Sequence, residues 1–247
     1  GSQDPYAFRR QSLGVLRIMI EKEIDLPLRL FIRKALSLFG IEQVRQAGKK
    51  IEAASVEIED FFLQRLSGLL RGGGYRYDQD LIAAVLSADW ETPADAAKLI
   101  GELSGMRARD ELANFITAMK RVANIITSSP GVNESETDPM HAIKALGSRN
   151  TDELPFSEKL FEECAEKELF DSSVSAASEV LNSIEEGKVY RVFNILDDKV
   201  VDSVNIFFER VMVNCKDEGL RSNRHSFLKT LNTFFSHYCD YSLVQED

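Results

Sequence analysis

The sequence of 247 residues is poor in the residue types from which catalytic and metal centres are usually built. Its three histidines are followed by Ala142, Ser226 and Tyr238, so none forms an adjacent His-Asp pair, and their scatter gives no metal-ligand spacing. This composition argues against a metal-dependent phosphohydrolase, which needs several such ligands around one ion. We predict neither a catalytic residue nor a metal ligand in this chain.

Phosphate-binding loops and nucleophile motifs are also missing. The triple glycine Gly72–Gly74 lacks the following Lys-Ser/Thr of a P-loop, and no predicted strand precedes it as in a dinucleotide site. Serines are frequent, but no Gly-x-Ser-x-Gly elbow occurs. We therefore interpret the glycines as the end of a helix followed by a turn.

Long apolar runs and paired cysteines are absent as well. No run approaches the roughly 18 to 20 apolar residues that span a bilayer, so we expect no membrane partner. Three cysteines without paired spacing predict free thiols in a reducing compartment, with Cys215 as a small buried residue on a helix stripe. Gly1-Ser2 is typical of a scar left by tag removal, so we expect a fragment that begins at Gln3 or Asp4.

What the sequence does contain is helical periodicity, and we predict an all-α fold. Apolar residues recur three and four positions apart in nearly every segment, and no useful strand alternation appears. The predicted helices start at Asp4-Pro5 and include Leu13 to Ile24, Pro27 to Phe39 (ended by Gly40), Ile58 to Leu69, Asp78 to Leu86, Pro93 to Leu103, Glu111 to Thr127, Asp138 to Gly147, one from Pro155 through Cys164, Val174 to Ile184, Val189 to Leu196, Val201 to Cys215 and Leu220 to Tyr238. The polar stretch 128–135 is predicted to be a flexible surface loop.

The last predicted helix carries a basic face. Its apolar residues form one stripe, and the opposite side is predicted to present basic side chains to solvent together, where they could meet phosphate. These residues are Arg221, Arg224, His225 and Lys229. The net charge of −10 does not contradict this, because eleven acidic and four basic residues lie between Glu134 and Asp171. A bound polyanion is expected to avoid that acidic segment.

Four segments in order resemble the β subunit of bacterial-type glycyl-tRNA synthetase. They are Asp4-Pro5-Tyr6-Ala7-Phe8-Arg9-Arg10 with Leu13 to Ile18, Gly74-Tyr75-Arg76-Tyr77-Asp78, Lys120 to Ile125, and the C-terminal run from Val201 through Leu231. His225 and the stretch from about Ser128 to Leu154 depart from the family pattern. The resemblance covers nearly the whole chain.

The resemblance implies a division into two parts. Residues 1–105 resemble the end of an HD-like and linker region, and residues 106–247 resemble a DALR-type anticodon-binding helical bundle. It also implies glycine tRNA and the α subunit as partners, in a parent of composition α2β2, without DNA or a membrane. The parent would use ATP and Mg in the α part, whereas the fragment would bind no cofactor and be inactive alone. A bacterial cytoplasmic location follows from the same resemblance.

Residues that could contact tRNA come from two predicted helices. In the family context, phosphate pairing or stacking on an unstacked anticodon base is expected of at least one arginine. The alternatives are an ion pair of Arg221 with Asp217 or Glu218, a bridge from Arg121 to Asp110 or Glu111, and a structural hydrogen bond for Asn223. Phe207, Phe208, Phe234 and Phe235 are predicted to pack in the core rather than stack on bases. The candidate RNA-binding residues are Lys120, Arg121, Asn124, Arg221, Asn223, Arg224 and Lys229.

A second function remains open on the sequence alone. The chain could be a helical module that docks the α subunit or another β subunit without touching tRNA. A basic strip along Lys120, Arg121, Arg221, Arg224 and Lys229 would favour RNA binding, whereas a broad apolar patch on the first 100 residues would favour docking.

Overall fold

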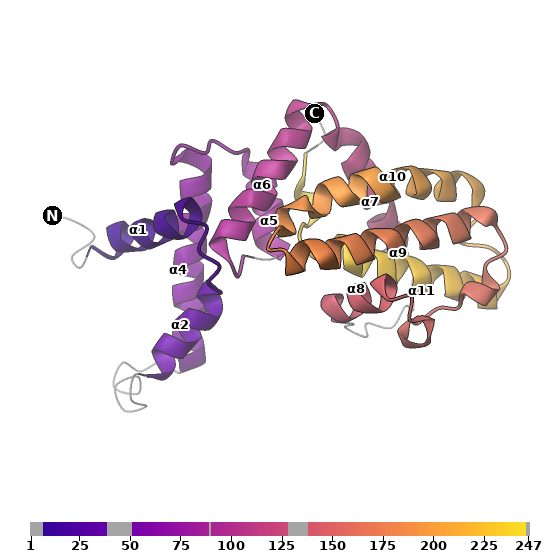
Figure 1. Cartoon of the computed structure of the whole chain (residues 1–247), viewed down its shortest axis with the longest axis horizontal. Helices are drawn as coiled ribbons and strands as arrows, with labels where there is room; N and C mark the ends of the chain where they lie inside the picture. Colours follow the sequence, from indigo (N-terminus) through magenta and orange to yellow (C-terminus); the bar gives the residue numbers. More distant parts are fainter. Residues whose placement is uncertain (1–6, 39–50, 89, 128–137, 246–247) are drawn as a thin grey trace. The chain divides into compact units, whose positions relative to one another are not determined.

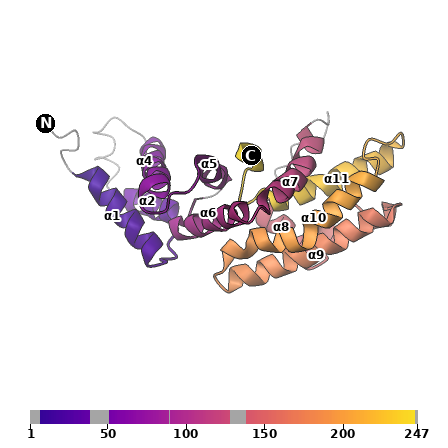
Figure 2. The same cartoon turned by 90° about the horizontal axis from the view of Figure 1, so that it is seen from above.

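The computed structural model describes residues 7–38, 51–88, 90–127 and 138–245, and within these ranges every regular element is a helix (Figures 1 and 2). The predicted all-α fold is confirmed. Two compact units divide the chain, residues 1–104 and residues 105–247. No helix in the described part is long and apolar enough to cross a membrane.

In the first unit, two short helices pack along one long helix. α1 (Phe8–Glu21) and α2 (Leu28–Ser37) both contact α4 (Ile51–Gly72), which also contacts α5 (Gln79–Ala88). α6 (Pro93–Ala108) follows and crosses the boundary between the units. The buried core is aliphatic, and it includes Leu16, Leu66, Leu70, Leu81 and Val85.

The ends of the first helices differ from the sequence prediction. α1 begins at Phe8 after Ala7, whose φ of 56° lies in the left-handed region, while Asp4 and Pro5 lie outside the described residues. It ends at Glu21, so Ile24 belongs to the connection rather than to the helix. α2 begins at Leu28, because Pro27 occupies the N-cap and not the first helical position. It ends at Ser37.

The second unit is a helical bundle. Its main helices are α7 (Leu112–Thr127), α8 (Pro139–Gly147), α9 (Cys164–Glu185), α10 (Val192–Arg210) and α11 (Glu218–Phe235). α9 packs against both α8 and α10, and α7 packs against α10 and α11. Short 3-10 turns, η1 (Thr151–Glu153), η2 (Glu158–Leu160), η3 (Val189–Arg191) and η4 (Tyr241–Leu243), connect or follow them.

Aromatic packing and one close helix approach define this bundle. Phe156 and Phe227 have ring centroids 4.9 Å apart, and Phe170 lies edge-on to Phe156 at 5.7 Å. A Cβ built on Gly147 would lie 3.1 Å from the backbone nitrogen of Ser178. The end of α8 therefore approaches the α9 backbone at a distance that leaves little room for a side chain.

Two sequence predictions in this unit were wrong, and a third is not tested. No helix starts at Pro155, because α9 begins at Cys164, where Glu163 and Glu166 form a capping box. The helices predicted at Val189–Leu196 and Val201–Cys215 are one helix, α10, preceded by η3. The predicted loop 128–135 lies outside the described residues.

Candidate nucleic-acid interface and an apolar groove

The sequence predicted that Arg224 lies on a solvent-exposed basic face, but in the structure it does not. It is only 4% exposed, and its Nε and Nη2 donate to the Glu166 carboxylate at 2.9 and 3.0 Å. Its Nη1 also donates to the Met212 carbonyl oxygen at 3.1 Å. The sequence analysis placed Arg224 opposite the apolar stripe, but Arg224 lies three positions before Phe227 and seven before Leu231. It is therefore at the edge of that stripe, where Glu166 of α9 and the turn after α10 cover it.

Glu166 is the matching acid that the sequence analysis missed. Its Oε2 accepts from the backbone N–H groups of Glu162 and Glu163, each at 3.0 Å. Burial acts to raise the pKa of this carboxyl, but the hydrogen bonds from Arg224 and from the two backbone groups outweigh burial and lower the pKa. Glu166 therefore joins the start of α9 to the middle of α11.

His225 is also buried rather than exposed on the basic face. Its Nε2 lies 2.9 Å from Asn214 Oδ1, and its Nδ1 is buried with no hydrogen-bond partner among the described residues. Burial, together with the nearby charge of Arg221, lowers the pKa of this imidazole. His225 is thus favoured in its neutral form.

Asn223 has the structural role that the sequence analysis weighed against RNA contact. Its Oδ1 accepts from the Ser157 backbone N–H at 2.8 Å, and its Nδ2 donates to the Ser157 carbonyl oxygen at 3.1 Å. This pairing fixes the segment before η2 against α11.

Arg221 remains partly exposed at the start of α11. Its Nη1 donates to the Cys215 carbonyl oxygen at 3.0 Å, and its Nη2 lies 3.8 Å from Glu218 Oε1. The ion pair with Glu218 is one of the alternatives foreseen from the sequence, and its long distance makes it weak. The side chain is 38% exposed, so Arg221 reaches the surface.

Arg121 forms a half-exposed platform with two residues of α10. Its guanidinium carbon lies 5.0 Å from the centre of the Phe208 ring, and its Nη1 donates to Asn205 Oδ1 at 3.1 Å. These partners replace the predicted bridge to Asp110 or Glu111. A planar cation stacked on a partly exposed ring is a surface on which an unstacked base can pack.

The remaining candidates lie on two helices. Lys120 of α7 donates to the Val244 carbonyl oxygen at 2.9 Å, which fastens the C-terminal segment to α7. Asn124 is exposed one turn beyond Arg121, and Lys229 of α11 is half-buried. The predicted strip is therefore interrupted by the buried Arg224.

The four phenylalanines that were predicted to pack in the core differ in their burial. Phe207, Phe234 and Phe235 are buried, so the predicted core role holds for these three. Phe208 is only half-buried, beneath Arg121. A period of three to four residues could not show this, because Phe208 lies at the edge of the buried stripe of α10.

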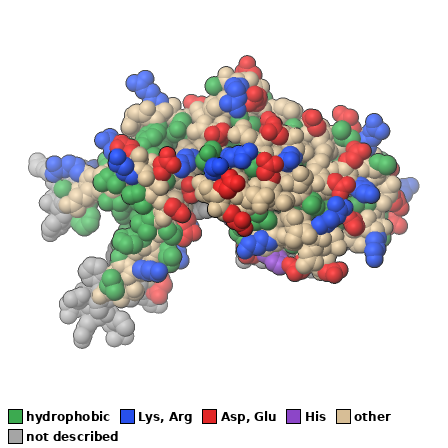
Figure 3. Space-filling model, in the orientation of Figure 1, with side chains coloured by type: hydrophobic (Ala, Val, Ile, Leu, Met, Phe, Trp, Pro, Cys, Tyr) green, Lys and Arg blue, Asp and Glu red, His purple; other side chains and the backbone are tan. Residues whose placement is uncertain are grey.

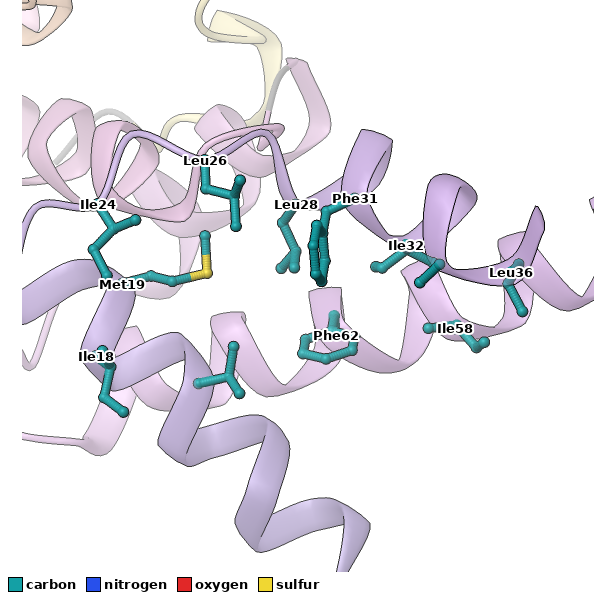
Figure 4. A pocket seen from close by; sticks show the side chains of 12 residues that line it. Ile18, Met19, Ile24, Leu26, Leu28, Phe31, Ile32, Leu36, Ile58 and Phe62 are labelled. Carbon is teal, nitrogen blue, oxygen red and sulfur yellow. The ribbon is translucent and has the colours of Figure 1, made fainter. Parts of the chain in front are cut away.

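The first unit carries a groove that the sequence analysis named only as a possible apolar patch. Side chains from α1, α2 and α4 point into a cavity of about 470 Å³ (Figure 4). Figure 3 shows hydrophobic side chains gathered over the same helices. The lining is entirely apolar and includes Val15, Ile18, Met19, Leu28, Phe31, Ile32, Ile58 and Phe62.

The cysteines form no disulfide, and they and the other possible metal ligands were compared with the sequence predictions. All three cysteines are free, with Cys164 exposed and Cys239 buried. Cys215 is half-buried and lies beyond the end of α10, not on a helix stripe as predicted. Over the ranges that the structure describes, no group of three or more His, Cys, Asp or Glu side chains could hold a metal ion.

Known proteins provide a direct comparison. The family model described as glycyl-tRNA synthetase beta subunit matches residues 1–87. The glycine-tRNA ligase beta subunit of Actinobacillus succinogenes is 32% identical over 249 residues, covering 99% of this chain and 32% of the relative. That of Geotalea daltonii is 32% identical over 244 residues, covering 98% of this chain and 31% of the relative.

The extent of these matches defines what the chain represents. The chain spans about a third of the length of the curated relatives it matches, yet almost all of its own length is included in each match. The four segments singled out in the sequence fall inside those matches. The chain belongs to the glycyl-tRNA synthetase β-subunit family and corresponds to a part of that subunit.

Proposed function

We propose that this chain is a tRNA-binding, C-terminal part of a glycine-tRNA ligase β subunit in the bacterial cytoplasm. Residues 105–247 would act as a DALR-type bundle that holds the anticodon arm of glycine tRNA. The α part would activate glycine with ATP and Mg²⁺ and transfer it to the 3′ end of the tRNA. The similarity to glycine-tRNA ligase beta subunits supports the role in glycyl-tRNA synthesis.

The observation that carries the tRNA proposal is the platform of Arg121 on Phe208. Arginine guanidinium and aromatic faces are the surfaces on which proteins stack single-stranded bases. Asn205 holds the guanidinium at 3.1 Å, so the plane is oriented before any ligand arrives. Asn124 and Arg221 are exposed or partly exposed and add a hydrogen-bonding group and a positive charge.

A titration of the chain with glycine tRNA and with a non-cognate tRNA, at two salt concentrations, tests the proposal. Preferred binding of glycine tRNA, weakened by Arg121→Ala, would support it. Arg224→Ala reports on folding rather than on RNA contact, since Arg224 is buried. Equal and weak binding of both tRNAs by the correctly folded chain would count against the anticodon role.

The groove on the first unit favours a second function, docking of another polypeptide. Phe31 is 54% exposed and Ile18 is 57% exposed although both line an apolar cavity. Exposed apolar patches of this kind mark interaction sites. Docking and tRNA binding involve different units and do not exclude each other.

A further inference from the structure

We infer that Asn205 selects the base that packs on the platform of Arg121 and Phe208, by donating a hydrogen bond to a base edge with two adjacent acceptors. Two edges have this pattern: the Watson–Crick side of cytosine, with O2 and N3, and the N7 and O6 side of guanine. Asn205 has this role only if RNA binds at the platform, so the inference rests on the proposed function. It adds to that function a residue that determines specificity.

The orientation of the Asn205 amide is fixed by Arg121. A guanidinium group only donates hydrogen bonds, so the amide atom that lies 3.1 Å from Arg121 Nη1 is the acceptor Oδ1. Nδ2 is the other branch of the amide and is turned away from that contact. Asn205 makes no second hydrogen bond among the described residues, and its side chain is half-buried. The amide therefore holds an unused donor whose direction is set before a ligand arrives.

The ring of Phe208 lies next to this donor and has room for a base. Phe208 follows Asn205 by three residues on α10, so the two side chains are neighbours on the helix surface. The Arg121 guanidinium carbon is 5.0 Å from the ring centre, whereas Arg65 lies 3.6 Å from the centre of Phe61 and covers it more closely. A base that packs on the ring beside the guanidinium lies in one layer with Arg121 and meets donors from both residues at its edge.

Charges around the platform favour a neutral base edge over a phosphate. Asp202 and Glu209 are exposed on α10, three residues before and four after Asn205, so both carboxylates flank the amide. Arg210 is exposed next to Glu209. α7 contains no acid, and its Lys120 already donates to a carbonyl oxygen of the C-terminal segment. A phosphate beside two carboxylates would be repelled, whereas a base carries no charge.

The fixed donors reject the remaining base edges. Adenine and uracil each place a donor next to an acceptor on the Watson–Crick edge, so two fixed donors would leave one N–H group of the base facing another. A polar group left unpaired in this way costs affinity. Asn124 cannot select in the same manner, because its exposed side chain has no hydrogen-bond partner among the described residues and can turn either its oxygen or its nitrogen toward a base.

The test uses fluorescently labelled RNA hexamers of uridine in which the third base is cytosine, guanine, adenine or uracil. Each hexamer is titrated with the full chain at low salt and followed by anisotropy. We expect the cytosine hexamer, the guanine hexamer or both to bind about tenfold more tightly than the adenine and uracil hexamers. Comparing cytosine with guanine identifies which of the two edges is used. Phe208→Ala and Arg121→Ala should weaken the binding of all four hexamers.

Asn205→Asp tests the amide donor itself. The variant keeps an acceptor for Arg121 and replaces Nδ2 by a second oxygen, so the tenfold preference should disappear. Ile206→Asp is the matched control, because it adds the same charge at the next position, which is 39% exposed, and leaves the amide in place. It should lower all four affinities alike and preserve the preference. A loss of folding would also lower all four alike, so the ratio of affinities reports on the amide.

The outcomes separate this inference from the proposed function. Equal binding of the four hexamers, weakened by Phe208→Ala and Arg121→Ala, would overturn the selection by Asn205 and leave the platform as an RNA site. A preference that persists in Asn205→Asp would do the same. Absence of binding, or binding that neither alanine variant weakens, would overturn the platform as an RNA site and the selection with it.

Discussion

Arg224 and Glu166 form a buried ion pair in which two guanidinium nitrogens meet two carboxylate oxygens at 2.9 and 3.0 Å. The side chains are 5% and 0% exposed, so water does not compensate either charge. Because Glu166 caps the start of α9 and Arg224 lies in α11, this pair fixes two helices of the bundle. A buried ion pair of this kind adds little net stability compared with well-packed apolar residues. Removing one partner, however, leaves the other charge buried and unpaired, which is strongly destabilising.

Breaking this pair from one side should be costly. Arg224→Met leaves the Glu166 carboxylate buried without its cation, and we expect a loss of about 3–5 kcal/mol in the free energy of unfolding. Chemical denaturation measures it. The double variant Arg224→Met/Glu166→Gln should be less destabilised than Arg224→Met alone, because no buried charge then remains unpaired. A double variant that is as unstable as the sum of the two single variants would contradict this account.

The helices of this chain show which features of the fold the apolar periodicity could predict and which it could not. Recurring apolar residues were enough to predict the all-α fold and helices such as α7, whose bounds agree with the predicted segment to within one residue. The helix predicted from Ile58 to Leu69 also exists, but as α4 it begins seven residues earlier, at Ile51.

The sequence analysis assigned Arg224 to the polar face of α11, although its spacing of three and seven positions from Phe227 and Leu231 places it beside the apolar stripe. The spacing could not show that its partner there would be Glu166, 58 positions earlier.

The sequence also predicted the ends of several helices wrongly, and it divided α10 into two helices. Pro155 is a plausible first residue of a helix, but the capping box of Glu163 and Glu166 starts α9 nine residues later at Cys164. Among the candidate RNA contacts, the sequence suggested Arg121 but not its partners, since Asn205 and Phe208 lie on another helix. Contacts between helices distant in sequence are not encoded in the pattern of either helix alone.

Acid should weaken the first unit through Glu59. Burial acts to raise the pKa of Glu59, but hydrogen bonds from Arg33, Ser55 and Arg29 outweigh it and lower the pKa to about 2. An acid with a lowered folded-state pKa stabilises the fold above its unfolded pKa of about 4.3, and this contribution is lost as the pH falls toward 2.

The pH dependence can be measured directly. Thermal unfolding of the chain between pH 5 and pH 2 should show a decline that is smaller in Glu59→Gln, because that variant has no carboxyl to protonate. The variant should also be less stable than the parent at neutral pH, where the parent carboxylate is charged. An identical decline in both proteins would show that Glu59 does not contribute to it.

His225 should make the second unit sensitive to mild acid. Its pKa is lowered by burial and by the charge of Arg221, so the unfolded chain binds a proton more readily than the folded chain. Stability is therefore complete above the unfolded pKa of about 6.5 and decreases as the pH falls below it. His225→Gln, compared between pH 7.5 and pH 5, should show a smaller decrease than the parent. A histidine with an ordinary pKa would leave the two slopes equal.

The C-terminal segment should depend on one buried hydroxyl. Tyr241 Oη donates to the Phe235 carbonyl oxygen at 3.0 Å, and its ring packs edge-on against Phe115 at 5.5 Å. Tyr241→Phe keeps the ring and removes the donor, so we expect a loss of about 0.5–1.5 kcal/mol in unfolding free energy. Tyr190→Phe is the comparison at a half-buried tyrosine. Equal losses in the two variants would mean that burial of the Tyr241 hydroxyl adds nothing.

The platform of Arg121 on Phe208 gives the sharpest test of the proposed tRNA contact. If a base stacks on it, Phe208→Ala and Arg121→Ala should each weaken binding of glycine tRNA by about 1–3 kcal/mol. Phe208→Ala should leave the salt dependence unchanged, because it removes no charge. If Arg121 instead meets a phosphate, Arg121→Ala should lower the slope of log affinity against log salt by about 0.7 to 0.9.

The controls separate RNA contact from folding. Arg121→Lys keeps the charge and loses the plane, so a stacking role predicts weak binding and a phosphate role predicts nearly normal binding. Arg224→Met should lower thermal stability while leaving the tRNA affinity of the folded fraction unchanged, because Arg224 does not reach the surface. If the Arg121 and Phe208 variants behave like Arg224→Met, with lower stability and normal tRNA affinity, the platform is a packing contact, and the groove between α1, α2 and α4 becomes the better candidate for the function of this chain.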